Sequence, residues 1–548
     1  MIVNMTDLPD TPAIAGSVCV VGAGPVGIAL ALRLAELGRD VVLLEAGGTT
    51  HDASKQDAYR GTVTDPALHY PLDEYRERRL GGTSTIWGGR CMPLDPIDFA
   101  PRDWIPDSGW PIGPDALAAY YPDANRLCEA GAFAYTLDAA FPDVRKPMIA
   151  GFAGQHFTSD TLERFSCPTD FGKRYRDRLA QSPRIRVLLG AAVTHIALNA
   201  DGTAVTGLSV RTDAGATVPI VAQAYVLATG GLETARLLLA SRDVQPSGIG
   251  NAHDVVGRYY MCHLAGTIGA FHATGAVWHG YDMAADGSYC RRRLALTAET
   301  QTAQRIGNFV ARLHHPRIAD PAHGASVLSA LYLGRMLVPA HYRKRLADEG
   351  AGGIATTARH AWNIARDPLA VAGFAKQMLV DRRLAERKFP SVVVAPKNNV
   401  YSLDFHAEQE PQPDSRVTLG EDRDAFGMPR LTVDWRYTRG DVTTVQTALA
   451  LLSDDLARSG CGRFDFDPDM VETEMTRYGA YGGHHIGTAR MGDDPRRSVV
   501  DKDCRVHGIA NLHLAGAAVF PTSSQANPTL TAVALALRLA DRLQVGAA

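Results

Sequence analysis

This sequence of 548 residues lacks an excess of charge, paired cysteines and long apolar runs. Its 56 basic and 59 acidic residues leave a net charge of −3, which does not favour a nucleic-acid partner. The eight cysteines include no CxxC pair and no zinc-type Cys/His spacing, so we expect no metal site and a reducing compartment. No charge-free run would cross a membrane, and the first residues, MIVNMTDLPDTPAIAGS, show no signal-peptide pattern. We therefore expect a cytoplasmic enzyme.

The segment from Val18 to Glu45 has the pattern of a strand, a glycine-rich turn, a helix and a second strand. It reads VCVVGAGPVGIALALRLAELGRDVVLLE, with G-x-G-x-x-G between the strand and the helix. Such glycines let the backbone approach a pyrophosphate at a helix N-terminus, and the acid that ends the second strand can bind ribose hydroxyls. A glycine-rich turn in another α/β fold would not explain Glu45. The segment predicts a dinucleotide site, and the acid makes a 2′-phosphate, and so NADP, unfavourable.

Two later segments are also rich in small residues. Residues 80–96 read LGGTSTIWGGRCMPLDP, in which glycines surround Trp87. So many small residues favour a loop pressed against a ligand over a turn that merely buries one aromatic ring. Residues 224–241, AYVLATGGLETARLLLAS, form a second strand–glycine–helix passage, which we expect beside the same cofactor.

The character of the chain changes between about residue 262 and residue 470. Segments of alternating polarity predict an antiparallel sheet. They cover residues 267–272, 308–314, 392–405, 416–419 and 431–435. Residues 325–388 read as a helical, basic insert. A basic amphipathic stretch can bind a membrane surface or an acidic partner, although a solvated helical face is the commoner explanation.

Two histidines and an asparagine stand out near the C-terminus. His484 and His485 lie in GGHHIGTARMG, and Asn527 precedes a helical pattern that starts at Pro528. Pro is favoured in the first turn of a helix and Asn just before it. The partial positive charge of a helix N-terminus attracts anions, which suits chemistry that removes a proton and leaves negative charge behind.

Together these motifs resemble the glucose–methanol–choline (GMC) oxidoreductases, which are FAD-dependent enzymes that oxidise alcohols and sugars. The resemblance rests on the Gly22–Gly24–Gly27/Glu45 unit, the GGTSTIWGG loop, ATGGLETARLLLAS, HHIGTARMG, and NPTLT before the last helix. These motifs follow the family's order from the N-terminus to the last helix. Residues 262–400 carry little of the resemblance. Some members have a second histidine at the position of Asn527. With an asparagine there, this chain is more similar to pyranose oxidases and bacterial sugar dehydrogenases.

The resemblance implies a two-lobed α/β fold. A Rossmann-type FAD-binding lobe would comprise residues 13–100, 155–261 and 475–548. A substrate lobe, built on a mostly antiparallel six-stranded sheet, would comprise residues 101–154 and 262–474, including the insert at 325–388.

The resemblance also implies roles for individual residues. In the family's H-x-x-G-T pattern, Gly487 and Thr488 identify His484, not His485, as the base. This base would take the proton of the substrate hydroxyl while a hydride moves to flavin N5. Asn527 takes the second catalytic position, where its amide can donate to the developing alkoxide. Substrate contacts are expected from Gln409, Tyr481 and His484. The expected cofactor-binding residues are Gly22, Gly24, Pro25, Val26, Gly27, Glu45, Ala46, Gly81, Gly82, Ser84, Trp87, Gly88, Gly89, Val193, Ala228, Thr229, Gly230, Gly516, Ala517, Asn527 and Thr529.

Departures from the family pattern refine these expectations. Pyranose oxidases with covalent flavin have a histidine directly before the tryptophan, where this chain has Ile86, so we expect non-covalent FAD. The acceptor that reoxidises the flavin could be oxygen or a quinone-like molecule, and the substrate a sugar, glycoside or other alcohol. Two alternatives stay open from the residues: a hydroxynitrile-type lyase with non-redox FAD, and a binding protein with an inactive site, which the intact His484 and Asn527 disfavour.

Overall fold

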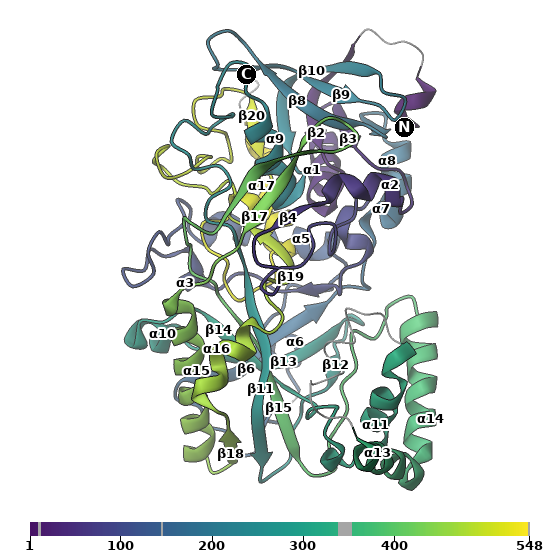
Figure 1. Cartoon of the computed structure of the whole chain (residues 1–548), viewed down its shortest axis with the longest axis vertical. Helices are drawn as coiled ribbons and strands as arrows, with labels where there is room; N and C mark the ends of the chain where they lie inside the picture. The colour runs from purple at the N-terminus through teal and green to yellow at the C-terminus, as the bar shows by residue number, and fades with distance from the viewer. Residues whose placement is uncertain (9–12, 144–145, 338–352, 546–548) are drawn as a thin grey trace.

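The computed structural model describes residues 1–8, 13–143, 146–337 and 353–545. The chain forms two stacked lobes, each built on a large β-sheet (Figure 1). Each sheet has its own buried apolar core, so the two-lobed α/β architecture expected from the sequence is confirmed.

The first lobe contains an eight-stranded sheet in the order β1-β7-β3-β2-β10-β9-β8, with β20 paired to β10. Its centre is parallel, and β8 and β9 add an antiparallel edge. Val18–Val21 in β2 is at most 5% exposed, as expected for a parallel strand covered on both faces. The strands are β1 (Ile2–Asn4), β2 (Ile14–Val21), β3 (Val41–Glu45), β7 (Ile185–Leu189), β8 (Ala192–Leu198), β9 (Val205–Arg211), β10 (Thr217–Leu227) and β20 (Leu512–Leu514).

The second lobe contains a nine-stranded sheet, larger than the six strands expected. Its main path is β18-β11-β15-β14-β13-β6-β5, its pairs are antiparallel, and β12 and β19 join its edges. The strands are β5 (Arg90–Cys91), β6 (Phe157–Phe165), β11 (Met261–Ala273), β12 (Tyr281–Met283), β13 (Tyr289–Leu296), β14 (Phe309–His314), β15 (Val400–Ala407), β18 (Gly462–Asp465) and β19 (Tyr481–Ile486).

The lobe boundaries and strand partners expected from the sequence need correction at several places. β6 was assigned to the FAD lobe but pairs with β13 of the second sheet. β16 (Arg416–Arg423) and β17 (Pro429–Asp434) form a separate sheet with β4 (Gly61–Val63), outside the large antiparallel sheet. In residues 392–405, the strand starts only at Val400. The α5 helix (Tyr121–Leu127), expected in the substrate lobe, contacts the C-terminal helix α17 (Thr529–Val545) of the first lobe.

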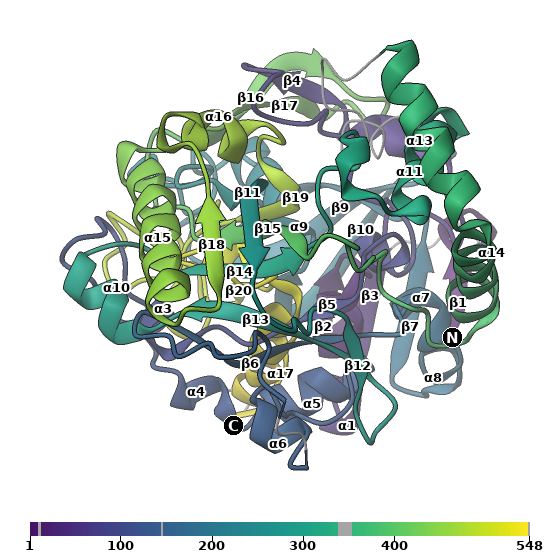
Figure 2. The same cartoon turned by 90° about the horizontal axis from the view of Figure 1, so that it is seen from below.

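Helices cover both sheets. α1 packs against α17 in the first lobe, while α15 and the insert helices α11, α13 and α14 lie on opposite sides of the second lobe (Figure 2). The described part of the insert is helical as expected; residues 338–352 of that prediction lie outside the described residues. The remaining helices are α1 (Pro25–Glu36), α2 (Ala53–Gln56), α3 (Pro96–Phe99), α4 (Asp115–Ala118), α6 (Leu137–Ala140), α7 (Phe171–Arg174), α8 (Arg176–Gln181), α9 (Gly230–Ala240), α10 (Ala298–Gln304), α11 (Ser326–Leu333), α13 (Ile354–Arg366), α14 (Pro368–Gln377), α15 (Arg439–Arg458) and α16 (Val471–Thr476). Among the helices in the described ranges, none combines the length and apolar character that a bilayer crossing requires.

Candidate active site

A cavity of about 1190 Å³ lies where the N-terminal ends of three helices meet. Its wall includes the first residues of α1, α9 and α17, together with residues of both lobes. Ordinary small-molecule pockets have volumes of roughly 300–1,000 Å³, so this cavity has room for a dinucleotide and a second, small reactant.

The glycine-rich turn before α1 shapes one part of the cavity. Gly22 has a φ of +100°, and a Cβ there would lie 2.6 Å from the carbonyl oxygen of Ala228. At Gly24, which precedes α1, a Cβ would meet no atom within 4 Å, because the position faces the cavity. No side chain caps the helix at Gly24. The turn thus leaves both space and backbone N–H groups for a phosphate group.

Glu45 lies at the carboxyl end of β3, beside this turn. Its carboxylate accepts N–H groups from Ala23 at 3.0 Å and from Gly47 at 2.8 Å. Burial raises the pKa of Glu45, and these backbone N–H groups counteract part of that rise. Each carboxylate oxygen keeps a further lone pair that can accept a hydroxyl, so this donor set fits the ribose of a dinucleotide.

The structure brings most of the expected cofactor-binding residues to this cavity. Gly27 and Gly81 do not line it. A Cβ at Gly27 would lie 1.9 Å from the carbonyl oxygen of Gly22, and one at Gly81 would lie 2.7 Å from the nitrogen of Gly172, so both allow close packing behind the wall. The expected residues that line it are Gly22, Gly24, Pro25, Val26, Glu45, Ala46, Gly82, Ser84, Trp87, Gly88, Gly89, Val193, Ala228, Thr229, Gly230, Gly516, Ala517, Asn527 and Thr529.

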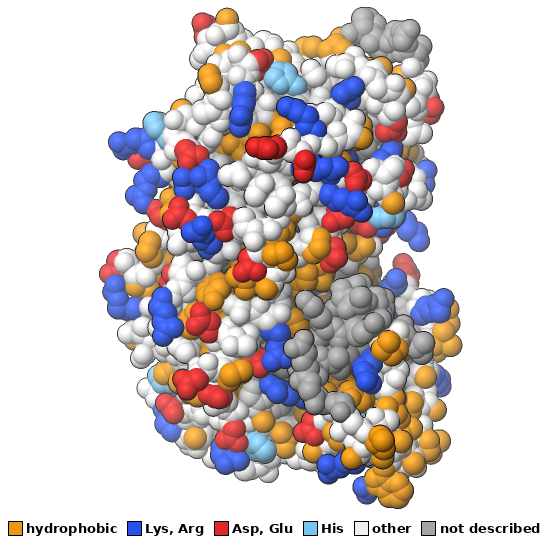
Figure 3. Space-filling model, viewed as in Figure 1, with side chains coloured by type: hydrophobic (Ala, Val, Ile, Leu, Met, Phe, Trp, Pro, Cys, Tyr) orange, Lys and Arg blue, Asp and Glu red, His pale blue; other side chains and the backbone are white. Residues whose placement is uncertain are grey.

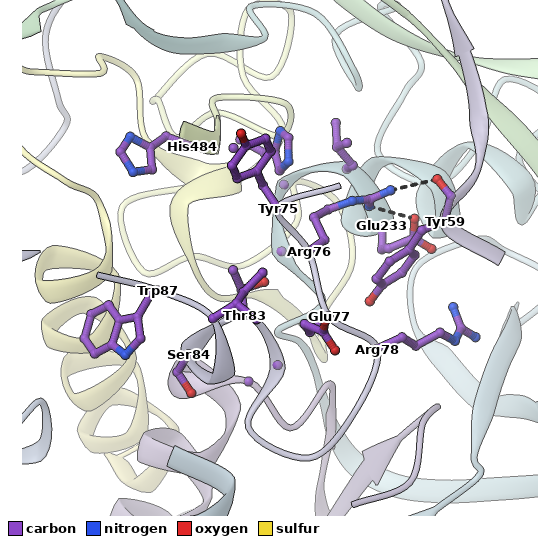
Figure 4. Close-up of a pocket in the computed structure, with 18 of the residues that line it drawn as sticks. Tyr59, Tyr75, Arg76, Glu77, Arg78, Thr83, Ser84, Trp87, Glu233 and His484 are labelled. Atoms are coloured by element: carbon purple, nitrogen blue, oxygen red, sulfur yellow. Dashed lines mark hydrogen bonds and ion pairs between the residues drawn. The ribbon is translucent and has the colours of Figure 1, made fainter. Parts of the chain in front are cut away.

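Residues 69–78 form a long part of the wall that the sequence analysis did not single out. Figure 4 shows the consecutive residues Tyr75 to Arg78 along the cavity, with Tyr75 near His484. Arg76 ties the segment to α9 through an ion pair with Glu233 at 3.2 Å. Tyr75 has a φ of +56°, and a Cβ at Gly483 would lie 2.6 Å from its Cβ. The mixture of aromatic and charged residues in HYPLDEYRER, directly before the glycine loop, was the available signal.

His484 and Asn527 face each other at the opposite end of the cavity. β19 carries His484, and Asn527 directly precedes α17. The Asn527 amide nitrogen lies 3.1 Å from Nε2 of His484. An amide NH₂ group can only donate, so Nε2 of His484 is the acceptor and carries a lone pair. Within the described residues, Oδ1 of Asn527 is buried and has no hydrogen-bond partner.

His263 holds the other side of the His484 ring. Its Nδ1 lies 2.7 Å from Nδ1 of His484. Because Nε2 of His484 is the acceptor from Asn527, its proton is on Nδ1 and is donated to His263. His263 is fully buried in β11, a strand that pairs with β19. No local feature of the sequence marks this residue, which lies 221 positions before His484.

The surroundings keep these histidines neutral. Burial, His263 and the cation Arg90 together hold the pKa of His484 well below its usual value. Burial likewise lowers the pKa of His263, to about 4. Arg90 also lies 3.4 Å from Nε2 of the buried His406 and pairs with Glu163 at 3.5 Å. Around neutral pH His484 is therefore an unprotonated base.

His485 belongs to a different cluster. Its Nδ1 lies 2.6 Å from the hydroxyl of Tyr260, which also lies 2.8 Å from Nε2 of His69 and accepts from Sγ of Cys262 at 3.3 Å. The ligand atoms of His69, Cys262 and His485 lie within 4.8 Å of one another, a spacing that could hold a metal ion. The Tyr260 hydroxyl already bonds to all three, so the cluster is explained as a hydrogen-bond network.

Two expected substrate residues are not placed as the sequence suggested. Gln409 is wholly buried and does not line the cavity. Its Oε1 accepts the backbone N–H of Cys262 at 2.7 Å and Nε1–H of Trp435 at 3.0 Å, and its amide donates to the carbonyl of Arg436 at 2.7 Å. The expected substrate contact of Gln409 is therefore wrong. Tyr481 lies in β19, but its side chain is outside the described part of the structure.

The insert also reaches the cavity. Arg382 and the following residues Pro390 and Ser391 line it, as do Phe165 and Tyr281 of the second lobe. The cavity wall therefore also offers aromatic, hydroxyl and cationic groups to a second reactant. Sequence reasoning treated the insert as a surface feature and did not place it at the site.

Comparison with known proteins agrees with this geometry. The family model described as FAD dependent oxidoreductase matches residues 17–322, and the one described as GMC oxidoreductase matches residues 411–536. The chain is 29% identical over 331 residues to the fructose dehydrogenase large subunit of Gluconobacter japonicus, a match that spans 59% of this chain but only 47% of that protein. It is 23% identical to 2-methyl-1,2-propanediol dehydrogenase of Mycolicibacterium austroafricanum, over 96% of this chain and 94% of that protein.

Solved structures share the fold. Pyridoxine 4-oxidase from Mesorbium loti aligns with a TM-score of 0.52 at 18% identity, covering 96% of this chain and 99% of that chain. A fungal aryl-alcohol oxidase aligns with a TM-score of 0.55 at 13% identity, covering 97% of this chain and 99% of that chain. The first family model spans more than half of the chain, and the second covers the segment with His484 and Asn527. The chain is thus a member of the GMC family of FAD-dependent oxidoreductases.

Proposed function

We propose that this enzyme oxidises a CH–OH group of a sugar, glycoside or other small alcohol to a carbonyl, with His484 as the base. The observation that carries the proposal is the pair of Nε2 of His484 and the Asn527 amide, 3.1 Å apart in the wall of a cavity whose other end fits FAD.

His484 and Asn527 have different roles in deprotonation of the substrate. His484 is neutral and has its lone pair on Nε2, so it can take the proton of a substrate hydroxyl. Nε2 has a single lone pair, so the substrate hydroxyl would take the place of the Asn527 N–H there. The freed amide N–H groups of Asn527 would then donate to the substrate oxygen as negative charge develops on it. The N-terminal end of α17, which lines the cavity next to Asn527, adds positive potential at the same place.

FAD would be held by the wall already described. The turn at Gly22–Gly24 and the N-terminus of α1 would bind the pyrophosphate, Glu45 the ribose, and the loop with Trp87 and the start of α17 would flank the ring. When bound, FAD accepts the carbon-bound hydrogen with its two electrons. The non-covalent state is also part of the proposal, supported by Ile86, which lines the cavity in place of a histidine before Trp87.

The substrate class is inferred from polar groups of the cavity wall and from the relatives. Arg382, Ser391 and Tyr281 provide polar groups suited to a hydroxylated molecule. The relatives carry the names of dehydrogenases and oxidases, including C-glycoside 3-oxidase and paromamine 6'-oxidase, which favours oxidation over the lyase alternative. Oxygen or a quinone-like molecule would reoxidise the flavin. A cytoplasmic location is proposed on the eight free cysteines.

The test is anaerobic reduction of the flavin by a panel of alcohols, sugars and glycosides. Wild-type protein should bleach with at least one of them. The His484→Ala variant should keep the yellow FAD but lose about 10²- to 10⁴-fold in the rate of bleaching, the usual contribution of a general base. His253→Ala, at an exposed position outside this cavity, is the control. Unchanged turnover in His484→Ala would exclude His484 as the base, and a flavin that no CH–OH compound reduces would exclude the oxidation.

A further inference from the structure

The α13 helix of the insert has its polar side buried and its apolar side exposed. His360 and Asn363 are 0% and 8% exposed, and both bond to Ser329 of α11. Ile354 and Trp362, eight positions apart and so on the same face, are 92% and 64% exposed. A helix at an ordinary protein surface has the opposite arrangement, because its apolar stripe faces the core.

The next helical segment continues this apolar surface. α14 and the π-helical turn that follows it, η6 (Met378–Leu384), contain no buried residue. Leu369, Leu379, Val380 and Leu384 are 83%, 51%, 44% and 70% exposed. We call the exposed side chains of residues 354–384 the insert face.

Exposed apolar side chains cluster in the insert face. Single exposed apolar residues are normal at a protein surface, so the clustering is the informative feature. Of the 15 large hydrophobic side chains that are exposed among the described residues, six belong to residues 354–384. Figure 3 shows hydrophobic side chains gathered over α13 and α14 at the lower right, with basic side chains around them. Contiguous apolar surface of this kind marks an interaction site.

The charges beside the insert face have one sign. Residues 353–388 contain seven Lys and Arg but three Asp and Glu, a net charge of +4 in a chain whose total is −3. Within the described ranges, the exposed Arg359, Arg366, Lys376 and Arg383 take part in no ion pair. Asp367 is already paired with Lys397 at 2.7 Å. The insert face thus combines apolar side chains with unneutralised cations.

We infer that the insert face docks this enzyme on an anionic lipid surface. Leu and Trp side chains would enter the boundary between headgroups and acyl chains, while Arg and Lys side chains bind lipid phosphates. A second copy is disfavoured, because a two-fold interface would place the same +4 segment against itself. Arg382 of this segment also lines the cavity, so docking would place the cavity close to the lipid.

The experiment is co-sedimentation of the FAD-loaded full chain with phosphatidylcholine vesicles that do or do not contain phosphatidylglycerol. We expect binding to the anionic vesicles that weakens as salt is raised. The double variant L369E/L384E should lower the partition coefficient about tenfold or more, since it places charge where the acyl boundary would be. V221E is the matched control, because Val221 is 44% exposed but lies on β10 of the first lobe.

A second pair of variants tests the charges separately. R366Q/R383Q keeps the apolar side chains, so it should still fold, and it should lose most of the salt-sensitive part of binding. Tm and turnover of a soluble alcohol, measured for every variant, should stay at wild-type values. The proposal is overturned if the wild type sediments with neither vesicle, if L369E/L384E binds as well as V221E, or if light scattering finds a dimer that L369E/L384E splits.

Discussion

His263 and His484 meet through their two Nδ1 atoms, 2.7 Å apart, and this contact fixes which nitrogen of His484 is the base. Both rings are kept neutral, so only one proton lies between them. With the Asn527 amide donating to Nε2, that proton belongs to His484. His263 thus acts as a positioning residue that presents the basic nitrogen to the cavity.

Replacing His263 by Phe should lower kcat about tenfold or more while changing KM little, because His484 loses the acceptor that sets its tautomer. His263→Gln should restore much of the activity, since its Oε1 can accept from Nδ1–H of His484. His272→Phe, farther along the same strand and half exposed, is the control. Steady-state kinetics with FAD content measured for each variant decide the matter. Equal losses in the Phe and Gln variants would show that only packing matters.

The pH dependence of kcat should reflect the lowered pKa of His484. The active form is the neutral ring, so activity should stay level around neutral pH and fall only on acidification, below the ordinary histidine pKa of about 6.5. Arg90→Gln removes one cause of the low pKa, so its acid limb should move to higher pH. Arg90→Lys retains the cation and should leave the limb near its wild-type position. An acid limb that does not move in Arg90→Gln contradicts this account.

Asn527→Asp should impair the enzyme in a way that Asn527→Ala does not. A carboxylate beside Nε2 stabilises the imidazolium, so it raises the pKa of His484 and protonates the base near neutral pH. Both variants lose the amide donor, which should cost about 100-fold in kcat. Only Asn527→Asp should also move the acid limb of the pH profile of kcat to higher pH. Stopped-flow flavin reduction across pH measures both effects, and coincident profiles would refute the close contact of residue 527 with Nε2 of His484.

Acid precipitation of the holoenzyme should release the flavin into the supernatant. Ile86 cannot form the linkage that a histidine before Trp87 would provide. The measurement is the absorbance of the supernatant against that of the pellet, with the released cofactor identified by mass. A pellet that stays yellow would mean that another side chain of the cavity is linked to the flavin.

Gln409→Ala should destabilise the protein without a specific effect on catalysis. The substitution leaves the buried N–H groups of Cys262 and Trp435 without their acceptor, which should cost about 2 kcal/mol or more in the free energy of unfolding. Denaturant unfolding measures the cost, with Gln304→Ala at the exposed end of α10 as the control. A stable Gln409→Ala variant with a raised KM would restore the substrate contact that the structure argues against.

Much of the first lobe could be predicted because its signals are local. The glycines at 22, 24 and 27 and the acid at 45 lie within one strand–helix–strand unit, where the backbone needs of a dinucleotide site act over a few residues. Alternating polarity located β16 and β17 correctly as strands. It could not identify their partners, because many sheets accept the same alternation.

The parts that were missed depend on contacts between distant segments. Nothing adjacent to His263 distinguishes it from a core histidine; its role comes from the pairing of β11 with β19. Gln409 was misassigned because a polar residue in a polar segment suggests exposure, whereas the folded chain uses its amide to satisfy Cys262 and Trp435. Local composition does not say which polar groups will be buried and need a partner.

The pairing of β11 with β19 also has a consequence for how the enzyme matures. His263 and His484 are 221 residues apart, and such distant pairings are slow to form because the intervening chain must first be closed into a loop. A chain in which β19 has not yet paired with β11 has the FAD-binding turn of the first lobe but no oriented base. The glycine-rich turn of the first lobe therefore forms from local sequence, whereas the base is oriented only once β19 has paired with a strand that lies far earlier in the chain.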